Sequence, residues 1–127
     1  MKSFNSLFAL VAAVAATFAV PAIAHHSGAG FATNTIEISG VVKEFQFKNP
    51  HSWIQVNVTD ATGKMVEWSI EWGSPNQLGR EGYRPSTFPA GAKVSFKIHP
   101  MSNGNPAGGF VAAKFADGKI IGKWDGD

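Results

Sequence analysis

Four histidines and the absence of cysteine define the chemistry that this chain can offer. Without cysteine there is no disulfide, no thiolate metal site and no cysteine nucleophile. The spacing suggests no Ser–His–Asp set, and no glycine-rich phosphate loop follows a predicted strand. Imidazole nitrogens that bind a metal ion or a ligand are therefore the first chemistry to consider. The histidines are His25, His26, His51 and His99.

Residues 1–24 have the three parts of a cleavable export signal. Lys2 gives a positive start, residues 7–20 form an uncharged apolar run, and Ala24 ends a small-x-small pattern. This run is shorter than the roughly 20 residues that a membrane-spanning helix needs. We expect a periplasmic or secreted protein with no membrane span after cleavage; an uncleaved membrane anchor is the alternative.

Cleavage after Ala24 would make His25 the first residue of the mature protein. A free terminal amine and the imidazole of the same residue can chelate one Cu(II) ion, which prefers nitrogen ligands in a tetragonal arrangement. The alternative is that His25 and His26 are simply two polar residues that follow the cleavage site and help processing.

Export would leave 103 residues, because 24 of the 127 are removed, and this length suits one domain. Lys2 leaves with the signal, so 10 basic residues face 9 acidic ones and the net charge is about +1. The lysines are scattered over separate segments and form no basic stripe, so we expect no nucleic-acid partner. The lysines in question are Lys93, Lys97, Lys114, Lys119 and Lys123.

Alternating apolar residues predict a chain of short strands. A capping signal at Ser74, with Pro75 at the first helical position and Gln77 placed for a capping box, predicts one short helix that ends near Gly82. Gly108-Gly109 falls in a predicted loop at 100–109 and is interpreted as a turn feature. The predicted strands are 35–48, 51–59, 64–72, 92–99 and a final segment, 110–124, broken by a hairpin turn at Asp117-Gly118.

Gly40 interrupts the first of these strands and predicts a bulge or a sharp bend. The buried phase is expected to shift there, from Ile38 and Val42 to Val41 and Phe45. Three strands, a short helix and two further strands are the order of an oligonucleotide/oligosaccharide-binding (OB) barrel. We therefore predict an all-β, five-stranded OB-like barrel at 35–127, preceded by a flexible N-terminal arm at 25–34.

The barrel topology would bring His51 and His99 together. His51 opens the second strand and His99 closes the fourth, and the loops beside them flank one binding face in an OB barrel. Glu71 has the matching outward phase on the third strand, so it should lie near His51 or Trp53 and could orient an imidazole. The structural alternative is that each histidine hydrogen-bonds loop carbonyls and fixes a turn.

Aromatic and polar side chains on the outer face suggest a second kind of ligand. Trp53 and Gln55 point outward from the second strand, and an exposed aromatic ring on an OB face can stack on a base or a sugar. Trp68 and Trp72 share the buried phase of the third strand and are expected in the core.

Five short motifs of the chain, taken together, carry a resemblance to a known family. They are Ala24-His25-His26-Ser27, Val42-Lys43-Glu44-Phe45, Asn49-Pro50-His51-Ser52-Trp53, Glu67-Trp68 and Gly73-Ser74-Pro75-Asn76. With them the chain resembles a family of short exported bacterial proteins known only as a domain of unknown function. The resemblance covers essentially the whole mature chain, and it implies export and a single small β-barrel domain, with no established activity.

Three hypotheses follow from these residues, and none of them specifies an oligomeric state. The first is a metal-binding module that uses the four histidines, with Cu(II) favoured and Zn(II) as the other metal that imidazole suits. The second is a module that binds a glycan or another small envelope ligand through Trp53, Gln55 and Glu71. The third, ranked last because no substrate groove is evident, is a copper-dependent redox enzyme.

Overall fold

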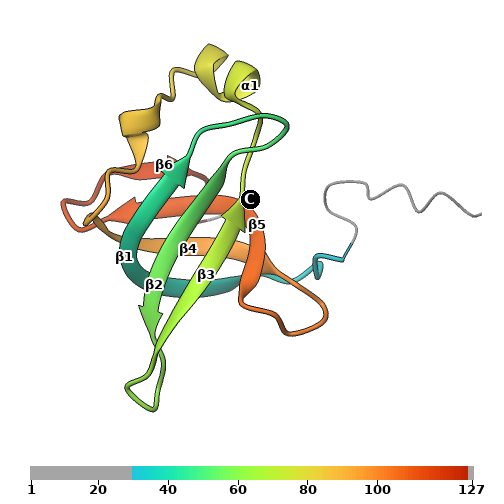
Figure 1. Cartoon of the computed structure of the whole chain (residues 1–127), viewed down its shortest axis with the longest axis vertical. Helices are drawn as coiled ribbons and strands as arrows, with labels where there is room; N and C mark the ends of the chain where they lie inside the picture. The colour runs from blue at the N-terminus through green and yellow to red at the C-terminus, as the bar shows by residue number, and fades with distance from the viewer. Residues whose placement is uncertain (1–29, 126–127) are drawn as a thin grey trace, which may run out of the picture.

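The computed structural model describes residues 30–125, and Figure 1 shows their curved sheet wrapping around itself. The predicted signal, together with His25 and His26, lies outside these described residues. Between residues 30 and 125 no helix combines the length and the apolar character that a bilayer crossing requires. The elements are β1 (Ile36–Gln46), β2 (Trp53–Thr59), β3 (Met65–Glu71), α1 (Pro75–Arg80), η1 (Pro85–Thr87), β4 (Lys93–Pro100), β5 (Ala107–Phe115) and β6 (Ile120–Gly122).

Five of the strands close into a barrel. The hydrogen-bonded order is β3-β2-β1-β4-β5-β6, and an additional pairing of β3 with β5 joins the two sides. This closing pair is parallel and short, with Ser69 opposite Ala107 and Glu71 opposite Gly109. β6 extends the sheet beyond β5. In chain order, α1 lies between β3 and β4. The predicted OB-like barrel with one short helix is therefore confirmed.

β1 bends so that its two halves pair with different strands (Figure 1). Residues 36–41 pair with β4, and residues 41–46 pair with β2. A side chain on Gly40 would overlap the carbonyl oxygen of Asn57, so glycine allows the close approach of β2. The irregularity in register lies further on, between Val42 and Glu44. The expected shift of phase to Val41 is wrong: Val41 is 38% exposed, whereas Val42 is buried.

The alternation predicted for the middle strands is confirmed, because the expected apolar positions fill the barrel. Trp68 and Trp72 pack against this core from partly buried positions. The sequence reasoning missed Phe88, which follows η1, is 1% exposed and contacts five other aromatic rings. The fully buried strand residues include Ile54, Val56, Ile70, Phe96 and Ile98.

The helix α1 begins where its capping signal predicts. The hydroxyl of Ser74 accepts a hydrogen bond from the backbone N–H of Gln77, and Pro75 occupies the first turn. The side chain of Gln77 contacts Glu81 rather than reaching back to complete a capping box. Leu78 is the buried residue of the helix, which lies at one end of the barrel (Figure 1).

β5 begins earlier than the sequence suggested, and this corrects the interpretation of Gly108-Gly109 as a turn. Both glycines lie in β5, where Gly108 pairs with Ile70 of β3 and with Pro100 of β4. Because Gly108 lacks a side chain, β4 can approach β5 closely: a Cβ there would lie 2.5 Å from the carbonyl oxygen of His99. The hairpin turn at Asp117-Gly118 between β5 and β6 is confirmed.

Candidate functional site

His51 and Glu71 come together at the ends of neighbouring strands. Trp53 of β2 pairs with Glu71 of β3, and the backbone pairing continues past the strand ends through Ser52 and Gly73. Nδ1 of His51 lies 2.5 Å from Oε1 of Glu71, a charge-assisted contact. The glutamate side chain is 15% exposed and the histidine 35%, so the carboxylate lies beneath an accessible imidazole.

His99 lies near the end of β4, where its ring is also held by a backbone acceptor. Its Nδ1 lies 3.0 Å from the carbonyl oxygen of Asn34, in the segment that leads into β1. This is the type of contact that the structural alternative anticipated for a histidine beside a loop. It also fixes the direction in which the rest of the ring points.

The closure of the barrel brings the two histidines to one pocket. His99 and Glu71 both pair with Gly109, from β4 and β3 respectively. Neighbouring strands are about 4.8 Å apart, so their backbones lie about 10 Å from each other across β5. Because Gly109 has no side chain, the ring of Phe31 can pack over it between these two strands. The resulting pocket of about 340 Å³, here called the histidine pocket, is lined by His51, Glu71 and His99.

Three aromatic side chains form walls of the histidine pocket: Phe31, Trp72 and Phe110. The rings of Trp72 and Phe110 have their centroids 4.4 Å apart, so they form one packed surface. Phe31 covers Gly109, where an ideal Cβ would lie 3.0 Å from its ring carbons. Sequence reasoning placed Trp72 in the core and assigned no role to the other two. The alternation of strand residues carries no signal for a wall built from three separate segments.

Both imidazoles are oriented in a way that leaves one nitrogen available. In a neutral ring, a proton on Nδ1 can be donated to Glu71 or to the Asn34 carbonyl, and Nε2 then carries a free lone pair. Metal-bound histidines in proteins are typically held by such a hydrogen bond from the other ring nitrogen to a carboxylate or a backbone carbonyl. The arrangement of His51 and His99 can therefore supply two nitrogen ligands.

These two histidines do not complete a metal site by themselves. Across residues 30–125 no three His, Cys, Asp or Glu side chains gather closely enough to hold an ion. The described chain does begin beside the pocket, since Gly30 precedes the wall residue Phe31. The backbone N–H of Ser102 donates a hydrogen bond to the carbonyl oxygen of Gly30, and the backbone N–H of Ala32 donates one to the carbonyl oxygen of Pro100. These two hydrogen bonds fasten the segment to the end of β4 and to the loop that follows.

The outer-face residues Trp53 and Gln55 do not line the histidine pocket. Trp53 is half-buried in β2, between the register partners Gln46 and Glu71. The side-chain oxygen of Gln55 accepts a hydrogen bond of 2.6 Å from the hydroxyl of Ser69. The structure thus places Glu71 in the histidine pocket with His51 and His99, whereas Trp53 and Gln55 lie on β2 outside this pocket.

Comparison with known proteins gives one match. A family described as "Family of unknown function (DUF6152)" matches residues 12–110, a span that includes every residue lining the histidine pocket. No curated protein matches the chain, and no solved structure matches it.

Proposed function

This chain belongs to the family of unknown function DUF6152, and we propose that it is an exported module that binds a copper ion in the histidine pocket. One observation carries the proposal: His51 and His99 line the same pocket, each with its Nδ1 beside an acceptor. Two Nε2 lone pairs are thereby offered to one space, and nitrogen ligands of this kind suit Cu(II).

The remaining ligands come from the start of the mature chain. If the signal is removed after Ala24, His25 is five residues from Gly30, and such a segment spans at most about 17 Å. Gly30 lies next to a residue of the pocket wall, so the terminal amine and the imidazoles of His25 and His26 are within reach. Four nitrogens drawn from these groups and from the imidazoles of His51 and His99 would match the tetragonal preference of Cu(II).

The same donor set ranks the competing metals. Mg²⁺ and Ca²⁺ prefer oxygen ligands, and the pocket contains one carboxylate, which is already in contact with His51. Zn(II) accepts imidazole readily and takes a tetrahedral geometry. Competition between copper and zinc for the mature protein therefore identifies the preferred metal.

The test is a Cu(II) titration of mature protein with its native N-terminus, followed by electron paramagnetic resonance. Intact mass first establishes that the chain starts at His25. We expect one dominant site with nitrogen coordination, and weaker binding for His51→Ala and His99→Ala. Glu71→Gln removes the charge that orients His51 and should weaken binding by about 10- to 100-fold. Gln55→Ala, on the same strand as Trp53 but outside the pocket, is the matched control.

Two results would contradict the shared site. If His25→Ala abolishes binding while His51→Ala and His99→Ala bind like the parent, the terminus alone chelates copper and the pocket has no part in it. If the parent binds no copper above buffer competition, the metal hypothesis fails. A glycine added before His25 displaces the terminal amine, so it reports separately on whether that amine is a ligand.

A further inference from the structure

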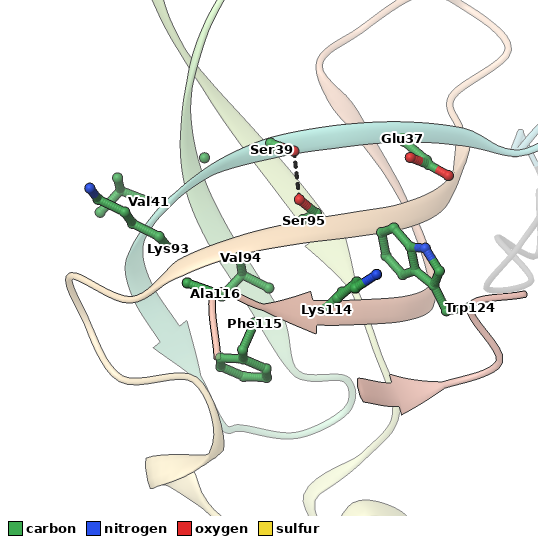
Figure 2. Close-up of a pocket in the computed structure, with 11 residues that line it drawn as sticks. Glu37, Ser39, Val41, Lys93, Val94, Ser95, Lys114, Phe115, Ala116 and Trp124 are labelled. Carbon is green, nitrogen blue, oxygen red and sulfur yellow. Dashed lines mark hydrogen bonds between the residues drawn. The ribbon is translucent and has the colours of Figure 1, made fainter. Parts of the chain in front are cut away.

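The outer face of β1, β4 and β5 carries a second hollow, which shares no lining residue with the histidine pocket. This hollow, here called the lysine groove, has a volume of about 650 Å³ and is shown in Figure 2. Two serines from neighbouring strands lie on its floor, because the register places Ser39 opposite Ser95. Their hydroxyl oxygens are 2.7 Å apart, and each retains hydrogen-bonding capacity for a further partner.

Lysines that are separated in the sequence gather around this floor. Lys93 and Lys97 flank Ser95 at positions two residues away on β4, so all three side chains share the outer face. Lys114 of β5 is the register partner of Ser95. These three lysines lie on separate segments of the sequence, and the adjacency of β4 and β5 in the sheet brings them to one outer face. Glu37 is the acidic residue among those that line the groove.

Trp124, which follows β6, forms the aromatic wall of the groove (Figure 2). The amino group of Lys97 donates to the carbonyl oxygen of Trp124, which fixes this segment over β4. The amino nitrogens of Lys97 and Lys114 lie 5.5 and 6.0 Å from the centre of the indole ring. The ring is half-buried, so part of it remains open beside positively charged groups.

We propose that the lysine groove binds a short segment of an acidic polysaccharide, one whose sugar rings carry carboxylates. The apolar face of a sugar ring packs on the indole of Trp124. The carboxylates of successive sugars accept charge-assisted hydrogen bonds from Lys93 and Lys114, which lie toward opposite ends of the groove (Figure 2). The Ser39 and Ser95 hydroxyls bond the sugar hydroxyls. The hypothesis of a glycan ligand is thus moved from Trp53 to the other side of the barrel.

The charges favour an acidic sugar over a nucleic acid. Binding to a phosphate backbone depends on many Lys or Arg contacts along a basic stripe. The groove offers Lys93 and Lys114, and Glu37 lies in the same lining. Its lining contains no arginine, which is the residue suited to two-point recognition of a phosphate. One aromatic wall, two hydroxyls and two amino groups match a sugar acid more closely.

The test uses the mature chain and two defined probes, an oligogalacturonate and a neutral cello-oligosaccharide of the same length, with binding measured by calorimetry. We expect the acidic oligomer to bind and the neutral one to bind much more weakly or not at all. The double variant Lys93→Ala/Lys114→Ala and the single variant Trp124→Ala should each lose at least about tenfold in affinity. The control variant Lys48→Ala/Lys64→Ala also removes two positive charges, but at exposed positions outside the groove, and it is expected to bind like the parent. Thermal melting confirms that each variant is folded.

Three outcomes would overturn the proposal. No binding of oligogalacturonate by the parent rules out the acidic-glycan site. An equal loss in both double variants means that net charge alone attracts the probe. Tighter binding of single-stranded DNA of equal charge assigns the groove to a nucleic acid instead. None of these measurements requires copper, so their failure and that of the copper site are distinguishable.

Discussion

Gly108 lies where the barrel closes, and replacing it with alanine adds a methyl group for which the closed sheet has no room. An ideal Cβ there would lie 2.5 Å from the carbonyl oxygen of His99 and 2.9 Å from Cδ1 of Ile98. The first of these contacts is with backbone, which cannot move aside without shifting β4 away from β5. The pairing of Gly108 with Ile70 makes the same residue part of the closing contact between β3 and β5.

The size of the effect follows from two opposing terms. Overpacking of a tight site costs about 1–3 kcal/mol. Replacing glycine restricts the unfolded chain and returns about 0.4–1 kcal/mol. The middle of the first range exceeds that of the second, so we expect Gly108→Ala to lower the free energy of unfolding by about 1–2 kcal/mol. For a domain of this size, the melting temperature should fall by roughly 4–16 °C.

Calorimetry on Gly108→Ala and on a matched control gives the assay. Gly79→Ala adds the same methyl group in α1, where the nearest atom is Nη1 of Arg84 at 3.9 Å. Alanine favours a helix interior over glycine by about 0.5–1 kcal/mol, so this control should melt at or above the parent's temperature. Since β4 carries His99, Gly108→Ala should also weaken copper binding. If Gly108→Ala melts with the parent, the closure is looser than these distances imply and the reasoning is refuted.

Two further predictions concern local hydrogen bonds. Ser74→Ala removes the side-chain acceptor for the Gln77 N–H and should cost about 1 kcal/mol; an unchanged denaturation midpoint would show that the cap contributes nothing. Hydrogen bonds from the Thr62 hydroxyl, the Lys64 backbone and the Thr62 backbone hold the pKa of Asp60 below its ordinary value of 3.8. This contribution is present above pH 3.8 and is lost as the pH falls through the folded-state pKa, so Asp60→Asn should destabilise at pH 7 and converge with the parent in acid. A difference in melting temperature that stays constant with pH would contradict this origin.

Most of the barrel could be predicted because its strands are governed by local pattern. Side chains alternate across a strand, so the spacing of Val66, Trp68 and Ile70 already indicates which face is buried. The helix start at Ser74 and the turn at Asp117-Gly118 are equally local, since each depends on a few neighbouring residues. The order of these elements then points to the OB-like topology without reference to any contact.

The errors occurred at positions whose structure is determined by contacts between segments that are distant in the sequence. The pairing of β1 with β2 places the irregularity in register between Val42 and Glu44, so the alternation that includes Ile38 continues to Val42 and leaves Val41 exposed. Gly108 and Gly109 have the composition of a turn, yet they lie in β5, where a side chain on Gly108 would overlap the backbone of β4 and one on Gly109 would press against Phe31.

For the candidate sites too, some features follow from local sequence pattern and others from contacts between distant segments. The sequence by itself determined the ligand chemistry, which is imidazole without thiolate, and it determined the outward phase of His51, Glu71 and His99 through strand alternation. Only the tertiary structure decided that Glu71 and His99 lie on either side of Gly109 and line one pocket. It alone also set Lys114 opposite Ser95, because register across a closed barrel is fixed by packing over the whole sheet rather than by neighbours in the chain.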